Sequence, residues 1–254
     1  MHLMLVFIGL GYSLRHLTLE AVEELKTADV IYVDTYTSLY EDPIEELRSI
    51  NPKAEYIYAK RKDLEGPAIR RVVNEALRRK IIIAVPGDPF IATTHDAILS
   101  EAIKYKVPYK IINGISVFTM VYGRVGLQSY RFGKPVTLVY PTHFKPYSTI
   151  EVIYDNLSRR LHTLVLLDLR VDESKAMSIP EAVDIILELD EKKLLRNNLA
   201  IGLARLGWRD EKICADTLEK LKNHSYPPPP HSLVITGGLD PVEEEFIEHW
   251  RTTC

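Results

Sequence analysis

The sequence is poor in cysteine. Its 254 residues include only Cys214 and Cys254, so we expect no disulfide framework, and a reducing, cytoplasmic environment fits this composition. Neither cysteine has a histidine or carboxylate at a spacing typical of a metal site. The chain also lacks a Gly-x-Ser-x-Gly elbow and a Gly-x-x-x-x-Gly-Lys-Ser/Thr loop, so serine nucleophile chemistry, metal catalysis and a phosphate-cradling loop are without support.

An excess of charge of one sign is also lacking. The 32 basic and 35 acidic side chains give a formal net charge of -3, which offers no electrostatic reason to expect a nucleic acid or a membrane surface as partner. The apolar start, MHLMLVFIGLG, has no basic leader and breaks at Gly9, too early to span a bilayer. We therefore predict no nucleic-acid partner and no membrane association, and we interpret the start as a buried strand.

The first half of the chain alternates between strand-like and helix-like patterns. Strands are predicted at 3–8, 30–33, 55–59, 81–85 and 109–112, and helices at 17–28, 43–50, 67–79 and 93–104. Strands separated by helices, without hairpin signals, predict a mostly parallel sheet with helices on both faces. In such sheets ligands bind beyond the carboxyl ends of the strands.

The pattern changes after Asn113-Gly114. Strands are predicted at 136–140, 164–167, 199–203, 212–215 and 232–236, and helices at 150–160, 180–191 and 241–250. Ser178 and Glu181 have the spacing of a capping box at the start of one helix. Because some of these strands are separated only by a turn, the second sheet is predicted to be mixed. We therefore predict a two-domain α/β protein with domains 1–113 and 114–254.

Two turn motifs fall at the predicted carboxyl edge of the first sheet. Gly9-Leu10-Gly11 lacks the third glycine of a dinucleotide fingerprint, since Leu14 stands in its place. Pro86-Gly87-Asp88-Pro89 is explained either as a tight turn or as a loop that directs Asp88 at a ligand. The hydroxyls of the following Thr93-Thr94 are placed to cap the next helix, and for His95 we favour a capping or surface role over a catalytic one.

The other histidines have no pattern typical of catalysis. His231 stands directly before the strand-like SLVIT, where a histidine is usually a hydrogen-bonded structural residue. His143 and His162 have no stronger claim, because none of these residues has the spacing of a metal site. We therefore predict no metal centre.

Six segments of the chain resemble the diphthine synthase family of the tetrapyrrole-methylase superfamily. In chain order they are FIGLG, YTSLYED, PGDPFIATTH, GLQSYRFGK, LHTLVLLDL and PPHSLVITGGLD. The resemblance covers nearly the full chain and implies a tetrapyrrole-methylase-like fold, a homodimer, and S-adenosylmethionine bound in the cleft between the domains, with S-adenosylhomocysteine as product. It further implies methylation of the 3-amino-3-carboxypropyl-histidine of translation elongation factor 2, on the amino group, to the trimethylammonium of diphthine in diphthamide biosynthesis.

The resemblance also implies which residues contact the cofactor. They are Leu10, Asp88, Ile91, Ser116, Val117, Leu167, Leu206 and His231. Ser116 and backbone groups are expected at the polar parts of the cofactor, the aliphatic side chains at its adenine, and Asp88 near its methionine or ribose portion. The segment Tyr12-Ser13-Leu14-Arg15-His16 departs from the family, whose members commonly have acidic residues there.

Methyl transfer from a sulfonium to an amine is a direct displacement that needs alignment and exclusion of water. The amine must be unprotonated to attack, and an apolar cleft favours its neutral form. Asp34, His95 and His231 are the candidate bases, and Tyr36 or Tyr140 is expected to receive the methylated cation. Two alternatives stay open, a precorrin-type C-methyltransferase that acts on a tetrapyrrole ring and a non-catalytic regulator that binds S-adenosylmethionine.

Overall fold

The computed structural model describes residues 3–142 and 144–254, and the chain divides into two compact units. The N-terminal domain extends to Phe118 and includes Arg170–Ser174, and the C-terminal domain consists of Thr119–Leu169 and Lys175–Cys254. The sequence predicted a boundary after residue 113, whereas the two units part inside helix α5 (Val117–Val125).

The N-terminal domain contains a five-stranded parallel sheet with the strand order β3-β2-β4-β1-β5. The strands are β1 (Met4–Gly11), β2 (Val30–Asp34), β3 (Glu55–Ala59), β4 (Lys80–Pro86) and β5 (Tyr109–Ile112). Strands β1, β2 and β4 are rich in Ile and Val and almost wholly buried, as expected of strands covered on both faces. The predicted α/β class is therefore confirmed for this half.

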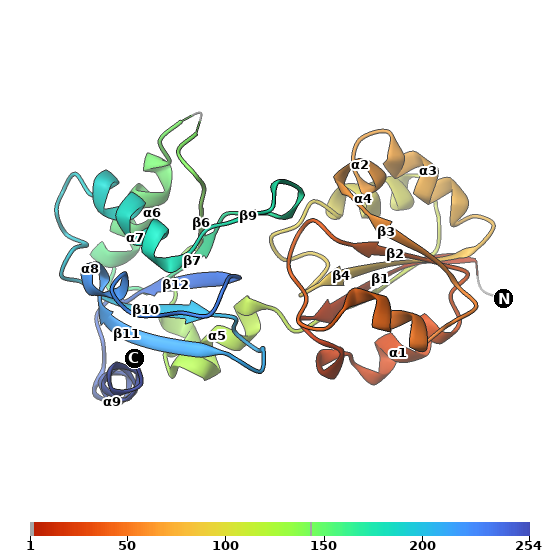
Figure 1. Ribbon diagram of the computed structural model, residues 1–254. Coiled ribbons are helices and arrows are strands. Elements are labelled where there is room, and N and C mark those ends of the chain that lie inside the picture. The colour runs from red at the N-terminus through yellow and green to blue at the C-terminus, as the bar shows by residue number, and fades with distance from the viewer. Residues whose placement is uncertain (1–2, 143) are drawn as a thin grey trace. The chain divides into compact units, whose positions relative to one another are not determined.

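Helices cover both faces of this sheet (Figure 1). Helix α1 (Leu19–Lys26) lies on one face, and α2 (Arg61–Leu64), α3 (Ala68–Glu75) and α4 (Asp96–Lys104) lie on the other. Each face has its own apolar cluster, with Leu25 and Ile82 in one and Phe7 and Ile83 in the other. The predicted helix at 43–50 is a 3-10 helix, Ile44–Ser49.

The C-terminal domain contains a five-stranded mixed sheet with the order β11-β10-β12-β7-β6. Its strands are β6 (Val136–Leu138), β7 (Thr163–Leu167), β10 (Leu199–Ala204), β11 (Lys212–Thr217) and β12 (His231–Ile235). Only β6 and β7 are parallel; the other pairs are antiparallel, which confirms the predicted mixed sheet. Strands β8 (Leu169–Arg170) and β9 (Lys175–Ala176) form a separate short hairpin.

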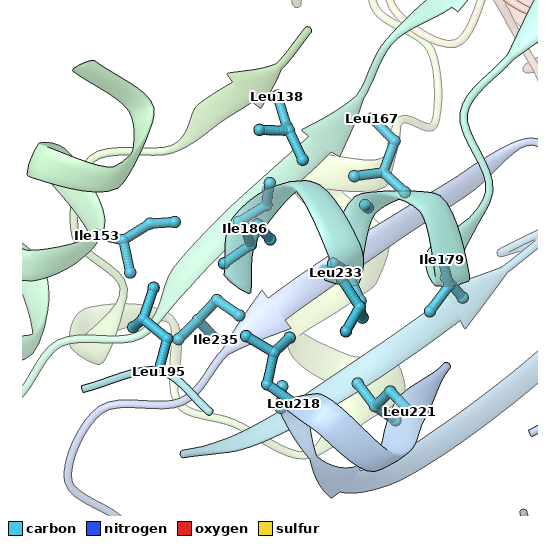
Figure 2. Packing of buried hydrophobic residues seen from close by; sticks show 14 of the residues in the cluster. Leu138, Ile153, Leu167, Ile179, Ile186, Leu195, Leu218, Leu221, Leu233 and Ile235 are labelled. Atoms are coloured by element: carbon cyan, nitrogen blue, oxygen red, sulfur yellow. The ribbon is translucent and has the colours of Figure 1, made fainter. Parts of the chain in front are cut away.

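Helices α6 (Tyr147–Ser158), α7 (Ile179–Leu189) and α8 (Leu218–Leu221) build the C-terminal core with this sheet. Figure 2 shows Ile179 and Ile186 of α7 packed against Leu233 and Ile235 of β12. Ser178 and Glu181 form the predicted capping box at the start of α7. A last helix, α9 (Pro241–Thr252), contacts the edge strand β11.

Cys214 and Cys254 are joined in a disulfide, which we did not expect from the sequence. Cys214 lies on β11 and Cys254 follows α9, which packs along β11 and brings the two residues together across 40 positions of sequence. His224 lies close enough for its ring nitrogen and both sulfur atoms to fall within 4.8 Å of one another. Because the sulfur atoms bond each other, they are not available as thiolate ligands in this structure.

The longest helices of the described residues, α6 and α9, have 12 residues each. None of the helices in that part of the chain has both the length and the apolar character needed to cross a membrane.

Candidate functional site

Three loops meet backbone to backbone at the carboxyl edge of the N-terminal sheet. A Cβ atom on Gly9 would lie 2.3 Å from the nitrogen of Gly114, and one on Gly114 would lie 2.1 Å from the carbonyl oxygen of Gly87. Gly11 and Gly87 exchange backbone hydrogen bonds of 3.1 and 2.6 Å. Since any side chain at Gly9 or Gly114 would collide with backbone, glycine is required there by the close approach. The loops after β1, β4 and β5 therefore form one rigid unit.

Asp88 ties two of these loops together through its carboxylate. Its Oδ1 accepts the N–H of Phe90 at 2.9 Å, and its Oδ2 accepts from the side-chain amide of Asn113 at 2.9 Å and from the N–H of Gly114 at 3.1 Å. The residue is 4 % exposed, and each of these partners is an N–H donor. Asp88 thus fixes the loop geometry, while its predicted contact with a cofactor stays a prediction.

Tyr12 supports the start of α5 from within the same domain. Its hydroxyl accepts the N–H of Val117 at 3.2 Å, and burial raises the pKa of the phenol, so that it stays neutral. Ser116 is buried and Val117 is partly exposed. Leu10 is fully buried in β1. The structure therefore places these predicted cofactor residues at one sheet edge, with Val117 more accessible to a ligand than Leu10.

The turn after Asp88 contains Ile91, which is partly exposed. Two side chains hold this turn through the carbonyl oxygen of Pro89. Thr93 donates its hydroxyl to this oxygen at 2.5 Å, and His95 donates from Nδ1 at 3.2 Å. The predicted capping by threonine was wrong, because α4 begins at Asp96 and these hydroxyls bind elsewhere; that of Thr94 reaches Glu65 at 2.8 Å. The two threonines hold the turn instead.

His95 and Asp34 form a buried pair between the ends of β4 and β2. Nε2 of His95 lies 3.1 Å from Oδ2 of Asp34, and the residues are 1 % and 0 % exposed. The expected surface role for His95 was therefore wrong. The two atoms are close, but their geometry does not meet the angular requirements of a hydrogen bond.

The hydrogen-bond partners fix the protons of this pair. Nδ1 of His95 must carry a proton, because the carbonyl oxygen of Pro89 only accepts. A neutral ring would then direct the lone pair of Nε2 at a carboxylate oxygen. Asp34 accepts the N–H groups of Tyr36 and Thr37 at 2.8 and 3.0 Å and the Thr37 hydroxyl at 2.8 Å. Two facing lone pairs 3.1 Å apart would repel each other, so one proton is bound between Nε2 of His95 and Oδ2 of Asp34.

The remaining predicted cofactor residues meet at one edge of the C-terminal sheet. Ala204 of β10 pairs with His231 of β12, and Ser232 pairs with Leu166 of β7. This register brings the ends of β10 and β7 beside the start of β12. Leu206, Leu167 and His231 belong to this edge, and each is less than 9 % exposed.

His231 uses both ring nitrogens within the protein. Nδ1 accepts the N–H of Ile179 at 3.1 Å, and Nε2 donates to the carbonyl oxygen of Pro227 at 2.7 Å. Burial lowers the pKa of the ring, so it stays neutral near pH 7. His231 therefore holds the start of α7 against the proline run, and only its ring face or backbone is left for a cofactor.

His162 is a second buried structural histidine. Its Nδ1 accepts the N–H of Gly237 at 2.9 Å, and its Nε2 faces Oε1 of Glu243 at 3.3 Å. Burial lowers the pKa of this ring as well. Both contacts agree with the structural interpretation made from the sequence, while His143 lies outside the described residues.

None of the three candidate bases is placed to take a proton from a substrate. Asp34, His95 and His231 are all buried, and their polar atoms contact other groups of the protein. Proton removal by any of them would require the surrounding contacts to break. In the described residues, these side chains therefore serve contacts within the protein, and their predicted role as bases stays a prediction.

The two tyrosines expected to receive a cation each carry one from the protein itself. The guanidinium carbon of Arg61 lies 5.0 Å from the ring centre of Tyr36, and the Nζ of Lys175 lies 3.9 Å from that of Tyr140. Both distances are within the range of a cation–π contact. Tyr140 lies at the same sheet edge as Leu167. Its N–H donates to Asp168, which directly follows Leu167 in the sequence.

The sequence did not reveal the contacts of Asn113 and Gly114 with Asp88. Asn113-Gly114 was interpreted only as the place where the pattern changes. The sequence did contain a signal for them, because Asn113-Gly114 follows the end of a strand at Ile112. Parallel strands bring their carboxyl ends to one edge of a sheet, where Asp88 also lies.

Known proteins resemble this chain in sequence and in fold. Residues 4–222 match the family model described as Tetrapyrrole (Corrin/Porphyrin) Methylases. The chain is 56 % identical to the diphthine synthase of Staphylothermus marinus over 248 residues, which cover 97 % of this chain and 93 % of that protein. It is 33 % identical to the diphthine methyl ester synthase of Bos taurus over 270 residues, covering 96 % of this chain and 94 % of that protein. A solved structure described as diphthine synthase superposes with a TM-score of 0.89 at 33 % identity, covering 98 % of this chain and 96 % of that one.

Proposed function

The chain belongs to the diphthine synthase group of the tetrapyrrole (corrin/porphyrin) methylase family, and from this membership we propose how it acts. It is an S-adenosylmethionine-dependent methyltransferase of diphthamide biosynthesis. Its proposed acceptor is the amino group of the 3-amino-3-carboxypropyl-histidine of translation elongation factor 2, which becomes a trimethylammonium. The observation that carries the proposal is the 56 % identity to a diphthine synthase across nearly the whole chain.

The residues at the two sheet edges fit the proposed cofactor. Ile91 and Val117 offer partly exposed aliphatic side chains to a flat adenine, on a frame held rigid by the three glycines. Leu167 and Leu206 add apolar surface on the C-terminal domain. We further propose that both groups contact one cofactor molecule. When bound, S-adenosylmethionine supplies the methyl group on a sulfonium, so the acceptor needs alignment more than acid or base catalysis.

The chain contributes to this reaction by positioning. Asp88 keeps the loop after β4 in register with Asn113-Gly114, and His95 keeps the Ile91 turn fixed to the end of β2. A rigid frame lowers the entropy lost when two reactants are aligned. Apolar side chains exclude water and favour the neutral amine, which is the form that attacks.

Methyl transfer to modified elongation factor 2 tests the proposal. The protein is incubated with S-adenosylmethionine and elongation factor 2 that carries the aminocarboxypropyl-histidine, and methyl groups are located by peptide mass spectrometry. We expect methyl groups on the amino nitrogen that resist base treatment. A methyl group released by base would instead indicate an ester, and an unmethylated histidine in a competent substrate would refute the proposal.

Calorimetry tests the cofactor site separately. Asp88→Asn places an amide NH₂ against the N–H groups of Phe90, Asn113 or Gly114, so we expect weaker binding of S-adenosylmethionine. Asp96→Asn, on the exposed first turn of α4, is the matched control and is expected to bind normally. Equal affinity of the two variants would show that the turn does not depend on the Asp88 carboxylate.

A further inference from the structure

A cation lies on an aromatic face beside the predicted cofactor edge of the C-terminal domain. The Nζ of Lys175 is 3.9 Å from the ring centre of Tyr140. Tyr140 follows β6, which runs parallel to β7, and its N–H donates to Oδ2 of Asp168 at 3.1 Å. Asp168 directly follows Leu167, one of the residues expected to contact the cofactor. The ammonium group of Lys175 therefore lies over a tyrosine whose backbone is bonded to the residue after Leu167.

Two carboxylates contact Tyr140. The Tyr140 hydroxyl lies 3.5 Å from Oε1 of Glu181, and Asp168 lies at the backbone of the same tyrosine. Glu181 is held in place by Ser178, which donates to it from its N–H at 2.8 Å and from its hydroxyl at 2.7 Å. Partial burial works against its charge, but these hydrogen bonds and the charge of Lys175 hold the pKa of Glu181 below its usual range. The site is thus built to attract a cation.

Lys175 is not fixed in this position by an ion pair. It lies on the two-residue strand β9 and is exposed, and among the described residues its ammonium has no carboxylate within salt-bridge distance. Replacing this cation by another leaves the net charge of the site unchanged. A ligand ammonium can therefore take its position with little loss of protein contacts.

We propose that the face of Tyr140 binds the ammonium group of the acceptor and that Lys175 occupies this position until the acceptor displaces it. The bound ammonium loses its proton to water before each transfer, because only the neutral amine attacks. The inference rests on the proposed function, since it assigns the acceptor amine to a residue. An aromatic face suits an amine that is methylated repeatedly. Each transfer replaces an N–H by a methyl group, so a site made of hydrogen-bond acceptors would lose partners, whereas a cation–π contact needs no N–H.

The chain contains a matched control for this contact. In the same domain the Nζ of Lys192 lies 4.7 Å from the ring centre of Tyr154. That pair is on α6 and the segment after α7, and Tyr154 donates to Asp190 at 2.7 Å. This pair is also a lysine over a tyrosine ring, but no predicted cofactor residue is adjacent to it in sequence or paired with it in the sheet.

Binding of tetramethylammonium chloride tests the site without methyl transfer. The full chain is titrated at constant ionic strength, and NMR follows the tyrosine rings. We expect Lys175→Met to bind about three- to thirtyfold more tightly than the unsubstituted protein, Lys192→Met to show no change, Tyr140→Phe to keep binding and Tyr140→Leu to lose it. Equal affinities of Lys175→Met and Lys192→Met, or equal shifts with neutral tert-butanol, would overturn the proposal.

Kinetics then connect the site to the reaction. Tyr140→Leu is expected to raise the KM for modified elongation factor 2 about three- to thirtyfold while the Kd for S-adenosylmethionine is unchanged. Tyr140→Phe should stay near the unsubstituted protein. An unchanged KM in Tyr140→Leu would refute the assignment of the acceptor. Failure of the unsubstituted protein to methylate elongation factor 2 would refute the proposed function instead, and leave the tetramethylammonium result to stand by itself.

Discussion

Substitution of Asp34 tests the hydrogen-bond assignment of the buried pair. Asp34→Ala removes the acceptor of the hydrogen bonds from Tyr36 and Thr37, and it removes the partner of Nε2 of His95. A buried donor left without an acceptor costs about 1–3 kcal/mol. We therefore expect Asp34→Ala to lower the free energy of unfolding by roughly 3–5 kcal/mol.

Asp34→Asn is expected to be much milder, costing about 1 kcal/mol. The amide oxygen still accepts the N–H groups of Tyr36 and Thr37. Its NH₂ group donates to the Thr37 hydroxyl and to Nε2 of His95, provided that the ring gives up its Nε2 proton. The polar atoms then stay paired. Asp88→Asn is the contrasting case, because Phe90 and Gly114 present backbone N–H groups that cannot act as acceptors.

Urea unfolding separates these outcomes. Both tryptophans, Trp208 and Trp250, lie in the C-terminal domain, whereas Asp34 lies in the N-terminal domain. Far-UV circular dichroism therefore reports on both domains, and tryptophan fluorescence reports on the domain that was not changed. The free energy follows from the shift in midpoint at constant slope. If Asp34→Asn destabilises as much as Asp34→Ala, the hydrogen-bond assignment of the Asp34 and His95 pair is wrong.

Three further outcomes follow from the structure. Gly114→Ala should prevent the three loops from closing and lower soluble yield, whereas Gly123→Ala, with open space around its Cβ, should raise the melting temperature slightly; equal behaviour would refute the packing argument. Cys254→Ser opens a loop closed over 40 residues and should lower stability by about 4 kcal/mol, a loss that reductant reproduces in the unsubstituted chain; if neither lowers the urea midpoint, the disulfide does not form. Burial lowers the pKa values of His162 and His231. The stability that the two neutral rings contribute is therefore complete above about pH 6.5 and is lost as the pH falls below that value. A urea midpoint, followed by tryptophan fluorescence, that stays constant between about pH 7.5 and 5.5 would contradict this.

The fold was predictable because its signals are local. Buried runs such as 81–85 and the capping box of Ser178 and Glu181 determine strands and helix starts from a few neighbouring residues. The sequence also gave the parallel first sheet and the mixed second sheet. Helix starts were less predictable where side chains had other partners; Thr93 binds Pro89 rather than the first turn of α4.

The candidate site was only partly predictable, because its contacts join distant segments. Asp88 was identified, but its partner Asn113 lies 25 residues away. Asp34 and His95 come together only because β2 and β4 are neighbours in the sheet. The disulfide depends in the same way on α9 packing along β11. Resemblance to a family supplied residue names, whereas their physical roles required the structure.

The meeting of Gly9, Gly87 and Gly114 limits how this protein can be altered. A side chain added at Gly9 or Gly114 would meet the backbone of another loop, so the loops would have to change together at these positions. Single substitutions at these two glycines are therefore closed to laboratory evolution. New ligand preferences are more accessible through the partly exposed side chains of Ile91 and Val117, which can be varied while the frame beneath them stays intact.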